Sequence, residues 1–264
     1  MECAECGQRL GPPPRTGRPR RYCSRACQGR AYRRRRDEGR LAEAVRTAAT
    51  DPQARSTVEV AVALADAEGI GAVTLRVVAH RAGTALAAVH HDFGSRDRLV
   101  AAMVQRVLAA RATRAAPDDA TSALTALAED EWQAYVAHPW LVEVMASSRP
   151  PLVPAVLDGA RASIEAFRRA GLDGETAFTR YLALSGYVQG MALVLAAEQR
   201  ETVRTGTSYR AWWREELRRL DRTGAVLRHP WIADLAAPAP RETPDAATAF
   251  REGLERLVPA LLGA

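Results

Sequence analysis

Apolar residues recur every three or four positions through most of this 264-residue chain, and no stretch alternates as a half-buried strand does. In the second half, this spacing predicts helices at 121–137, 139–147, 153–170, 175–199, 208–222 and 245–262. Proline-containing breaks separate several of them, and Pro259 is expected to kink or loosen the last one. The sequence therefore predicts an all-α fold that ends in a helical bundle.

Three shorter helices are predicted upstream of the bundle. Ser56 and Glu59 form a capping box that is expected to start the first of them. Thr74 caps the second helix, and the third runs over 85–91, after a tight turn at Gly83. Three short helices with a glycine-bearing turn indicate a helix-turn-helix, whose last helix enters the major groove of DNA.

The run from Thr74 to Met103, TLRVVAHRAGTALAAVHHDFGSRDRLVAAM, resembles the DNA-binding domain of tetracycline-repressor (TetR) family regulators. The segment HPWLVEVMASSRPPL at 138–152 is similar to the C-terminal domain of the branch closest to the tetracycline repressor itself. The resemblance implies a ligand-responsive transcriptional regulator, usually a repressor. Such a protein binds a palindromic operator as a homodimer and leaves it when a small-molecule effector binds the body. The residues that fit the family pattern are Thr74, Arg76, Val78, Ala79, Ala82, Gly83, Thr84, Phe93, Ser95, Asp97 and Leu99.

The helix expected to enter the groove departs from the family pattern. His90 stands where the family usually has a phosphate-contacting tyrosine, and Asp92 where it usually has histidine or tyrosine, so Asp92 repels phosphate if it faces the DNA backbone. Arg96 keeps the charge of the usual lysine. The side chains at 85–88 can contact thymine methyl groups but cannot hydrogen-bond guanine, so we expect few base-specific contacts from this helix. The predicted DNA contacts are Thr74, Arg76, Thr84, Ala85, Leu86, Ala88, His90, His91 and Arg96.

All four cysteines lie in the first 27 residues, as Cys3-x2-Cys6 and Cys23-x3-Cys27. Two close pairs of thiols in a reducing compartment match a closed, tetrahedral, structural zinc site of the zinc-ribbon or treble-clef kind. The segment has few large apolar residues and so needs a metal to fold. Redox-active or incidental thiols are the alternative interpretation.

The first fifty residues are strongly basic. They contain 13 arginines and 5 acidic residues, a net charge of +8, whereas the whole chain carries +6, which leaves −2 for the rest. A basic head on a nearly neutral body indicates a polyanionic partner. Arg30, Arg33 and Arg34 share one face of the helix expected after Ser24 and are predicted to contact nucleic acid, although such runs are often only solvated. We expect this module to supply phosphate contacts that the methyl-rich reading helix lacks.

Two helices of the body are expected at the homodimer interface, by resemblance to the family. The helix at 175–199 carries Gly186-x3-Gly190, which permits close approach of a second helix, and the last helix has an apolar stripe. Packing within one chain is the alternative for each of these residues. The stripe consists of Phe250, Leu254, Leu257, Val258, Leu261 and Leu262.

Several side chains of the body are candidates for the pocket of an uncharged or amphipathic, aromatic-sized effector. Side chains of these types are also common in plain protein cores. His138 and His229, each in a His-Pro-Trp sequence, are expected at helix boundaries rather than as metal ligands. The effector-pocket candidates are Trp132, Tyr135, Trp140, Met145, Tyr181, Tyr187, Gln189 and Met191.

We expect three domains: a zinc-binding basic module at 1–50, a helix-turn-helix domain at 54–112 and an effector-binding and dimerisation domain at 118–264, with a linker at 50–55. The N-terminus lacks the order of a signal peptide, and the apolar stretch at 181–197 is short for a bilayer, so we expect a cytoplasmic protein with no membrane partner. The sequence contains no nucleotide-binding glycine loop and no recognisable pair of catalytic carboxylates, so we do not expect an enzyme. The alternative function is a zinc-dependent nucleic-acid-binding or interaction protein whose bundle dimerises and takes no effector.

Overall fold

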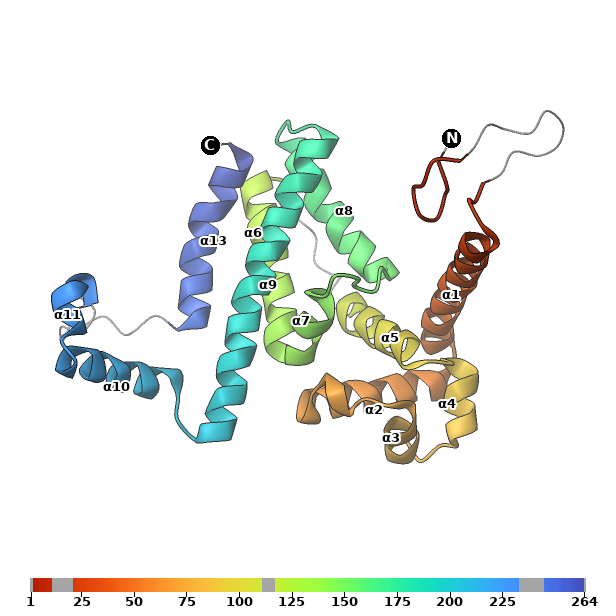
Figure 1. The fold of residues 1–264 in the computed structure, drawn as a ribbon, viewed down its shortest axis with the longest axis horizontal. Helices are drawn as coiled ribbons and strands as arrows, with labels where there is room; N and C mark the ends of the chain where they lie inside the picture. The colour runs from red at the N-terminus through yellow and green to blue at the C-terminus, as the bar shows by residue number, and fades with distance from the viewer. Residues whose placement is uncertain (1, 11–20, 111–116, 233–244, 264) are drawn as a thin grey trace. The chain divides into compact units, whose positions relative to one another are not determined.

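The computed structural model describes residues 2–10, 21–110, 117–232 and 245–263, with the side chains of 33–38 and 225–226 outside the description (Figure 1). Every regular element within these ranges is a helix, and one isolated antiparallel bridge joins Glu2 to Arg9. The prediction of an all-α fold is therefore confirmed. The chain divides into a first unit, Met1–Ala63 with Val73–Arg106, and a second unit, Leu64–Ala72 with Val107–Ala264.

The first unit contains the predicted helix-turn-helix. Thr74 caps α3, because its Oγ1 atom accepts a hydrogen bond from the backbone N–H of Val77 at 3.2 Å. Gly83 takes a positive φ of 62°, which allows the tight turn into α4. The helices that lie wholly or mostly in this unit are α1 (Arg25–Thr50), α2 (Pro52–Glu68), α3 (Leu75–Arg81), α4 (Leu86–Asp92) and α5 (Arg96–Ala109), and its core includes Val58, Val78, Val89, Phe93, Leu99 and Met103.

The junction between α1 and α2 differs from the prediction. A single residue, Asp51, separates the two helices: its N–H donates to the carbonyl of Thr47 at 2.8 Å, and its Oδ1 accepts from the N–H of Ala54 at 2.9 Å. An aspartate followed by proline is a strong helix start, since it supplies the cap and a residue that needs no N–H partner. The linker at 50–55 and the capping box at Ser56 are therefore wrong.

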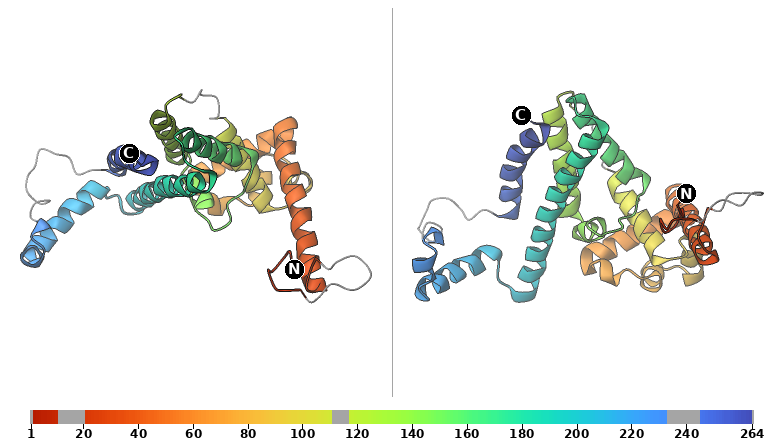
Figure 2. Two further views of the ribbon diagram at one scale, coloured as in Figure 1. Left: turned by 90° about the horizontal axis from the view of Figure 1, so that it is seen from above. Right: turned by 45° about the horizontal axis from the view of Figure 1, so that its top comes forward.

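The second unit is a bundle built around the long helix α9. This helix packs against α6, α8 and α13 and also contacts α7, and Figure 2 shows α6, α9 and α13 side by side. α10 packs against α11, and this pair extends from the end of α9 (Figures 1 and 2). The bounds are α6 (Ala120–Ala137), α7 (Pro139–Met145), α8 (Pro154–Arg169), α9 (Gly174–Thr205), α10 (Tyr209–Arg222), α11 (Ala225–Arg228) and α13 (Ala246–Leu262).

Aromatic packing holds three of these helices together. The ring of Trp132 on α6 stacks on Phe250 of α13 with centroids 4.3 Å apart, and Tyr187 of α9 donates its hydroxyl to the carbonyl of Phe250 at 2.8 Å. Each of the six predicted helices has a counterpart here, and α13 continues through Pro259 to Leu262. None of the described helices combines the length and the hydropathy needed to cross a membrane.

Candidate functional site

The candidate reading helix α4 presents one face to solvent. Ala85, Ala87, His90 and His91 are exposed, whereas Val89 is fully buried. A buried valine at the middle of so short a helix fixes which side chains can meet DNA. Of the other predicted contacts, Thr74, Arg76 and Arg96 are exposed, and Thr84, Leu86 and Ala88 are half-buried.

Arg96 also has a structural contact. Its Nε atom donates to the backbone carbonyl of Val73 at 2.8 Å, which ties the start of α5 to the turn before α3. The side chain is also exposed, and a guanidinium group carries five N–H donors in all. Arg96 therefore holds the helix-turn-helix together as well as carrying charge at its surface.

Asp92, at the end of α4, is half-buried and lines an open cavity of about 440 Å³ beside α1. Burial raises the pKa of the Asp92 carboxyl, His91 opposes the shift, and Asp51 adds to it. Arg40 of α1 and Arg98 of α5 line the same cavity. Sequence analysis missed both arginines: Arg40 reaches this place only through the packing of α1 against α4, whereas Arg98 lies on α5, six residues after Asp92.

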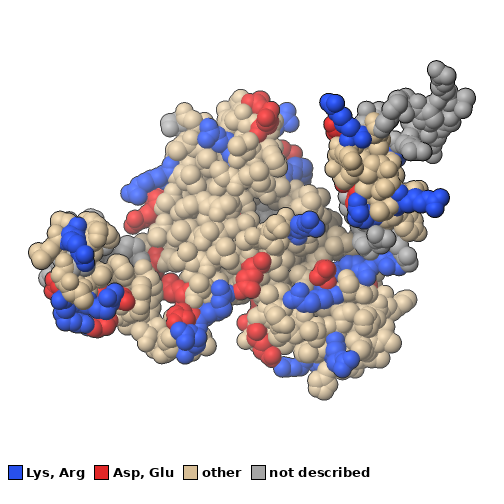
Figure 3. Space-filling model, in the orientation of Figure 1, with Lys and Arg blue, Asp and Glu red and all other residues tan. Residues whose placement is uncertain are grey.

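Helix α1 joins the cysteines to the helix-turn-helix without a break. It runs from Arg25 to Thr50, buries Ala44, Val45 and Ala48 near its end, and contacts α4. Figure 3 shows basic side chains at several points along the part of α1 that is described. The side chains of Arg33 and Arg34, both predicted DNA contacts, lie outside the described residues.

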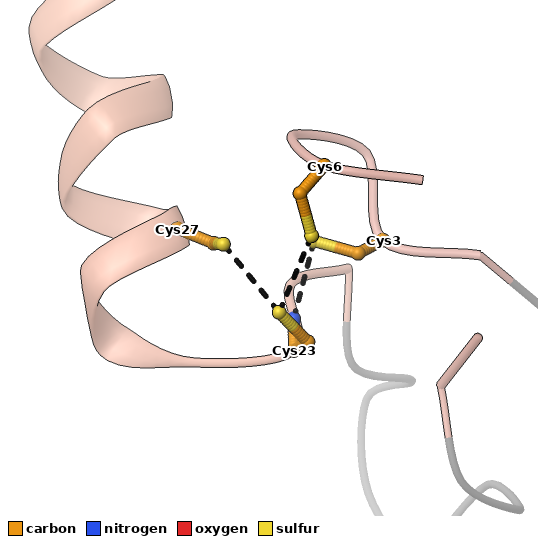
Figure 4. A group of neighbouring side chains, drawn as sticks. All are labelled: Cys3, Cys6, Cys23 and Cys27. Atoms are coloured by element: carbon orange, nitrogen blue, oxygen red, sulfur yellow. Dashed lines mark hydrogen bonds between the residues drawn. The ribbon is translucent and has the colours of Figure 1, made fainter. Parts of the chain in front are cut away.

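The four cysteines converge at the start of α1 (Figure 4). The Sγ atom of Cys23 lies 3.5 Å from that of Cys6 and 3.4 Å from that of Cys27, and all four sulfurs lie within 4.8 Å of one another. Four sulfurs bound about 2.3 Å from one tetrahedral zinc are about 3.8 Å apart. The cluster therefore has the dimensions of a four-thiolate zinc site.

Local hydrogen bonds arrange this cluster. Ser24 caps α1 by accepting from the N–H of Cys27 at 3.2 Å. Burial raises the pKa of the Cys3 thiol, but backbone N–H groups of Cys23, Glu5 and Cys6 together outweigh it and lower the pKa to about 6. Hydrogen bonds with Cys27 and then Cys6 raise the pKa of Cys23 to about 12. The lowered pKa of Cys3 favours the thiolate, the form that binds metal.

Arg30 lies against the same cluster. Its Nη2 atom donates to Sγ of Cys27 at 2.8 Å, and its Nε lies 3.8 Å from a carboxylate oxygen of Glu5. Its side chain remains 51% exposed, so the predicted DNA contact stays open to it.

The predicted effector-pocket residues fall into separate groups in the second unit. Trp132 and Tyr187 contact Phe250, as described above, and Trp140 is buried on α7. Tyr135 and Gln189 belong to a polar network between α6 and α9. Met145, Tyr181 and Met191 are half-buried.

The centre of that polar network is Glu131, which sequence analysis missed. Its Oε1 atom accepts from the hydroxyl of Tyr135 at 2.8 Å and from that of Ser185 at 3.2 Å, and Gln189 donates to Ser185 at 3.0 Å. Burial raises the pKa of Glu131, and the three hydrogen-bonding partners oppose the shift. An acid on the inner face of a helix, four residues before a tyrosine, is the signal that could have identified it.

The surface of α9 carries exposed small and apolar side chains. Gly186 and Gly190 are exposed, with Leu182 and Val194 on the same helix 52% and 56% exposed. Figure 3 shows a largely uncharged surface over α9. In contrast, the stripe on the last helix is mostly used within the chain: Phe250, Leu254, Val258 and Leu261 are buried against the bundle, which corrects their assignment to the dimer interface.

Residues 58–103 match the family described as "Bacterial regulatory proteins, tetR family", and residues 115–261 match "Tetracyclin repressor-like, C-terminal domain". The chain belongs to the TetR family. It is similar to the HTH-type transcriptional repressor DrrR1 of Streptomyces coeruleorubidus, with 32% identity over 181 residues that cover 68% of this chain and 67% of that protein. This TetR-family chain is therefore a ligand-responsive transcriptional repressor and not an enzyme, and it binds operator DNA, a second copy of itself and a small-molecule effector.

Solved structures of family members have the same fold. ActR from Streptomyces coelicolor in complex with actinorhodin is 25% identical, with a TM-score of 0.66 over 81% of this chain and 97% of that one. TetR from Acinetobacter baumannii is 22% identical, with a TM-score of 0.54 over 77% and 93% of the two chains, and supports the fold alone.

Proposed function

We propose that this repressor reads its operator with α4 and holds the flanking DNA backbone with α1. The observation that carries the proposal is the packing of α1 against α4 within the first unit. A basic helix held beside a reading helix loses less entropy on meeting phosphate than a free tail does. Arg30 and Arg40 are the described side chains of α1 that we assign to this role, and Arg33 and Arg34 are assigned from the sequence.

In this proposal, α4 reads sequence mainly through shape and methyl contacts. Ala85, Leu86 and Ala88 meet thymine methyl groups, and His90 and His91 supply the polar contacts of the helix. Thr74, Arg76, Thr84 and Arg96 contact the backbone or the groove edge. Because each protomer of the dimer carries one such helix, the operator is palindromic.

We also propose that Cys3, Cys6, Cys23 and Cys27 bind one structural zinc ion. The spacing of the sulfurs and the lowered pKa of Cys3 support this assignment. Bound zinc holds the two cysteine pairs together in a segment with little apolar core, and so fixes the start of α1. Arg30 is placed to offset the negative charge of the thiolates. Reduced thiols and an operator partner both favour action in the cytoplasm.

For the effector, we propose a site between α6 and α9, next to Glu131. The aromatic side chains of Trp132, Tyr135 and Tyr181 favour a flat, largely apolar molecule, and a carboxylate favours a ligand that donates a hydrogen bond. The ActR complex with actinorhodin supports a small molecule as the ligand of this second unit. The remaining predicted residues, Trp140, Met145, Tyr187, Gln189 and Met191, are assigned to the wall of the site or its support.

Selection from random DNA tests the proposal directly. Full-length protein is used with and without an Arg30→Gln and Arg40→Gln double substitution. We expect one enriched palindrome for both proteins, with weaker and less salt-dependent binding for the variant. No enriched palindrome from the full-length protein, or equal salt dependence for both, would contradict it.

A further inference from the structure

Asp66, near the end of α2, holds the junction between α6 and α7. Its Oδ1 atom accepts a hydrogen bond from Nε1 of Trp140 at 2.8 Å. Nδ1 of His138 lies 2.8 Å from the same oxygen and 3.1 Å from Oδ2. All three residues belong to the second unit, so this contact lies within one compact body.

The two partners of Asp66 occupy a sensitive place in the bundle. His138 is both the C-terminal cap of α6 and the N-terminal cap of α7, and Trp140 is buried in the first turn of α7. Glu131, the centre of the polar network with α9, lies two turns before His138 on the same helix α6. A shift of α6 or α7 therefore reaches Asp66 through side chains in direct contact.

Helix α2 continues from this contact into the first unit. It is one unbroken helix from Pro52 to Glu68, and the unit boundary falls between Ala63 and Leu64. Before that boundary, Thr57 and Val58 are buried in the core of the helix-turn-helix, and Glu59 pairs with Arg106 of α5 at 2.9 Å. A helix transmits displacement along its axis because its backbone hydrogen bonds resist bending.

We propose that Asp66 is the positioning residue through which the state of the bundle controls the operator-reading unit. In this proposal, the arrangement in which His138 and Trp140 hold α2 through Asp66 is the one that binds operator. Movement of the α6–α7 junction weakens the hold on Asp66, and α2 then carries the change into the first unit. The inference rests on the proposed function for its operator-binding step, but not on the identity of the effector.

Three substitutions in the full-length dimer separate this role from simple packing. Asp66→Asn keeps an acceptor for Trp140 but removes the charge opposite His138. His138→Gln removes the imidazole ring that pairs with Asp66. Trp140→Phe keeps an aromatic ring in the core but removes the N–H group that donates to Asp66. Glu129→Gln, an exposed acid on α6, is the control for loss of one negative charge.

We expect Asp66→Asn and His138→Gln each to weaken binding of the selected operator about tenfold, within the range of about 5- to 150-fold for coupling between sites. Affinity for unrelated DNA remains within twofold, because the phosphate contacts are unchanged. The variant that carries both substitutions is expected to bind operator with the same affinity as the single variant that binds less tightly, since both substitutions remove the same contact. A purely structural role predicts instead lower thermal stability with equal loss of both DNA affinities, and that result overturns the proposal.

Amide hydrogen exchange without DNA provides the second measurement. We expect faster exchange in α3 and α4 of Asp66→Asn and of Trp140→Phe, and unchanged exchange there in Glu129→Gln. Operator affinity of Asp66→Asn within twofold of the control, or unchanged exchange in α3 and α4, overturns the coupling. A wild-type protein that selects no operator overturns the proposed function, and the exchange result then decides the coupling by itself.

Discussion

The guanidinium group of Arg30 lies 2.8 Å from the sulfur of Cys27, one turn earlier on α1. An arginine that donates to a thiolate stabilises its negative charge and is itself held in one position. Arg30 therefore connects the basic side of α1 to the cysteine cluster, and under the proposed function we expect loss of the cluster to weaken DNA binding as well.

Removal of one thiolate tests this link. We expect Cys23→Ser to lose its zinc, about one ion per chain, and to bind operator about tenfold more weakly, because the start of α1 is no longer fixed. Native mass spectrometry measures the metal, and operator titration measures the affinity. The second unit contains no cysteine, so its unfolding temperature is expected to stay the same. Full zinc content in this variant would contradict the assignment.

Arg40 is expected to contribute a phosphate contact through α1. Arg40→Gln then lowers the slope of log K against log salt by about 0.9 for each protomer, with little change in the preferred sequence. The control is Arg161→Gln on α8, an exposed arginine of the second unit. Equal salt slopes for the two variants would show that Arg40 does not meet DNA.

His90 offers a gain-of-affinity test. A tyrosine at this exposed position restores the phosphate contact that the family resemblance implies, so we expect His90→Tyr to bind operator several-fold more tightly. Filter binding at fixed salt measures the change. The same substitution at His229, an exposed histidine of the second unit, serves as the control. Weaker binding by His90→Tyr would place this face of α4 away from the backbone.

Gly186 is predicted to lie at the homodimer interface. Within the chain, a Cβ atom added at this exposed position meets no atom within 4 Å, so we expect Gly186→Leu to fold but to hold two α9 helices apart. We expect a monomer by sedimentation at micromolar concentration, with operator affinity reduced at least a hundredfold because both half-sites no longer bind together. Gly159→Leu on α8, which is equally open within the chain, is the matched control. A dimer in both variants would move the interface elsewhere.

Glu131 predicts a pH dependence of stability. Burial raises its pKa above the ordinary value of 4.5, so the folded chain binds this proton more tightly than the unfolded chain does. The associated stability is present at low pH and is lost as the pH rises from 4.5 through the folded pKa. Glu131→Gln stays neutral and still accepts from Tyr135, so we expect it to unfold at a higher temperature than the wild type at pH 7 but not at pH 4.

Thermal unfolding of both proteins between pH 4 and pH 8 measures this difference. Glu129→Gln, on the exposed side of α6, is expected to show the pH profile of the wild type. A constant difference between Glu131→Gln and the wild type across that range would show that the carboxyl does not titrate there.

Local patterns were sufficient for elements whose contacts are close in sequence. Thr74 caps α3 as predicted, because a cap needs only its own turn, and the spacing of the cysteines anticipates their convergence. The start of α2 was misplaced since two cap signals, at Asp51 and Ser56, lie five residues apart and the first one prevails. The apolar stripe around Phe250 indicated a buried face, but periodicity does not say which helix covers it.

Contacts between distant residues could not be predicted in this way. Asp66 and His138 are 72 positions apart, and Glu131 and Ser185 are 54 positions apart. From its own helix alone, each of these side chains is explained by a local role, such as a solvated acid or a helix-boundary residue. Only the packing of α6 against α9, and the place of the end of α2, gives them a common role.

The one-residue junction at Asp51 has a consequence for how this regulator can be altered. Because a single extended residue joins α1 to α2, inserting or removing a residue there changes the direction in which α1 leaves the helix-turn-helix and so moves the cysteine cluster relative to α4. The length of this junction is therefore part of the geometry of the DNA-binding unit. The N-terminal module is held by a short, defined connection and does not hang from the helix-turn-helix on a flexible linker.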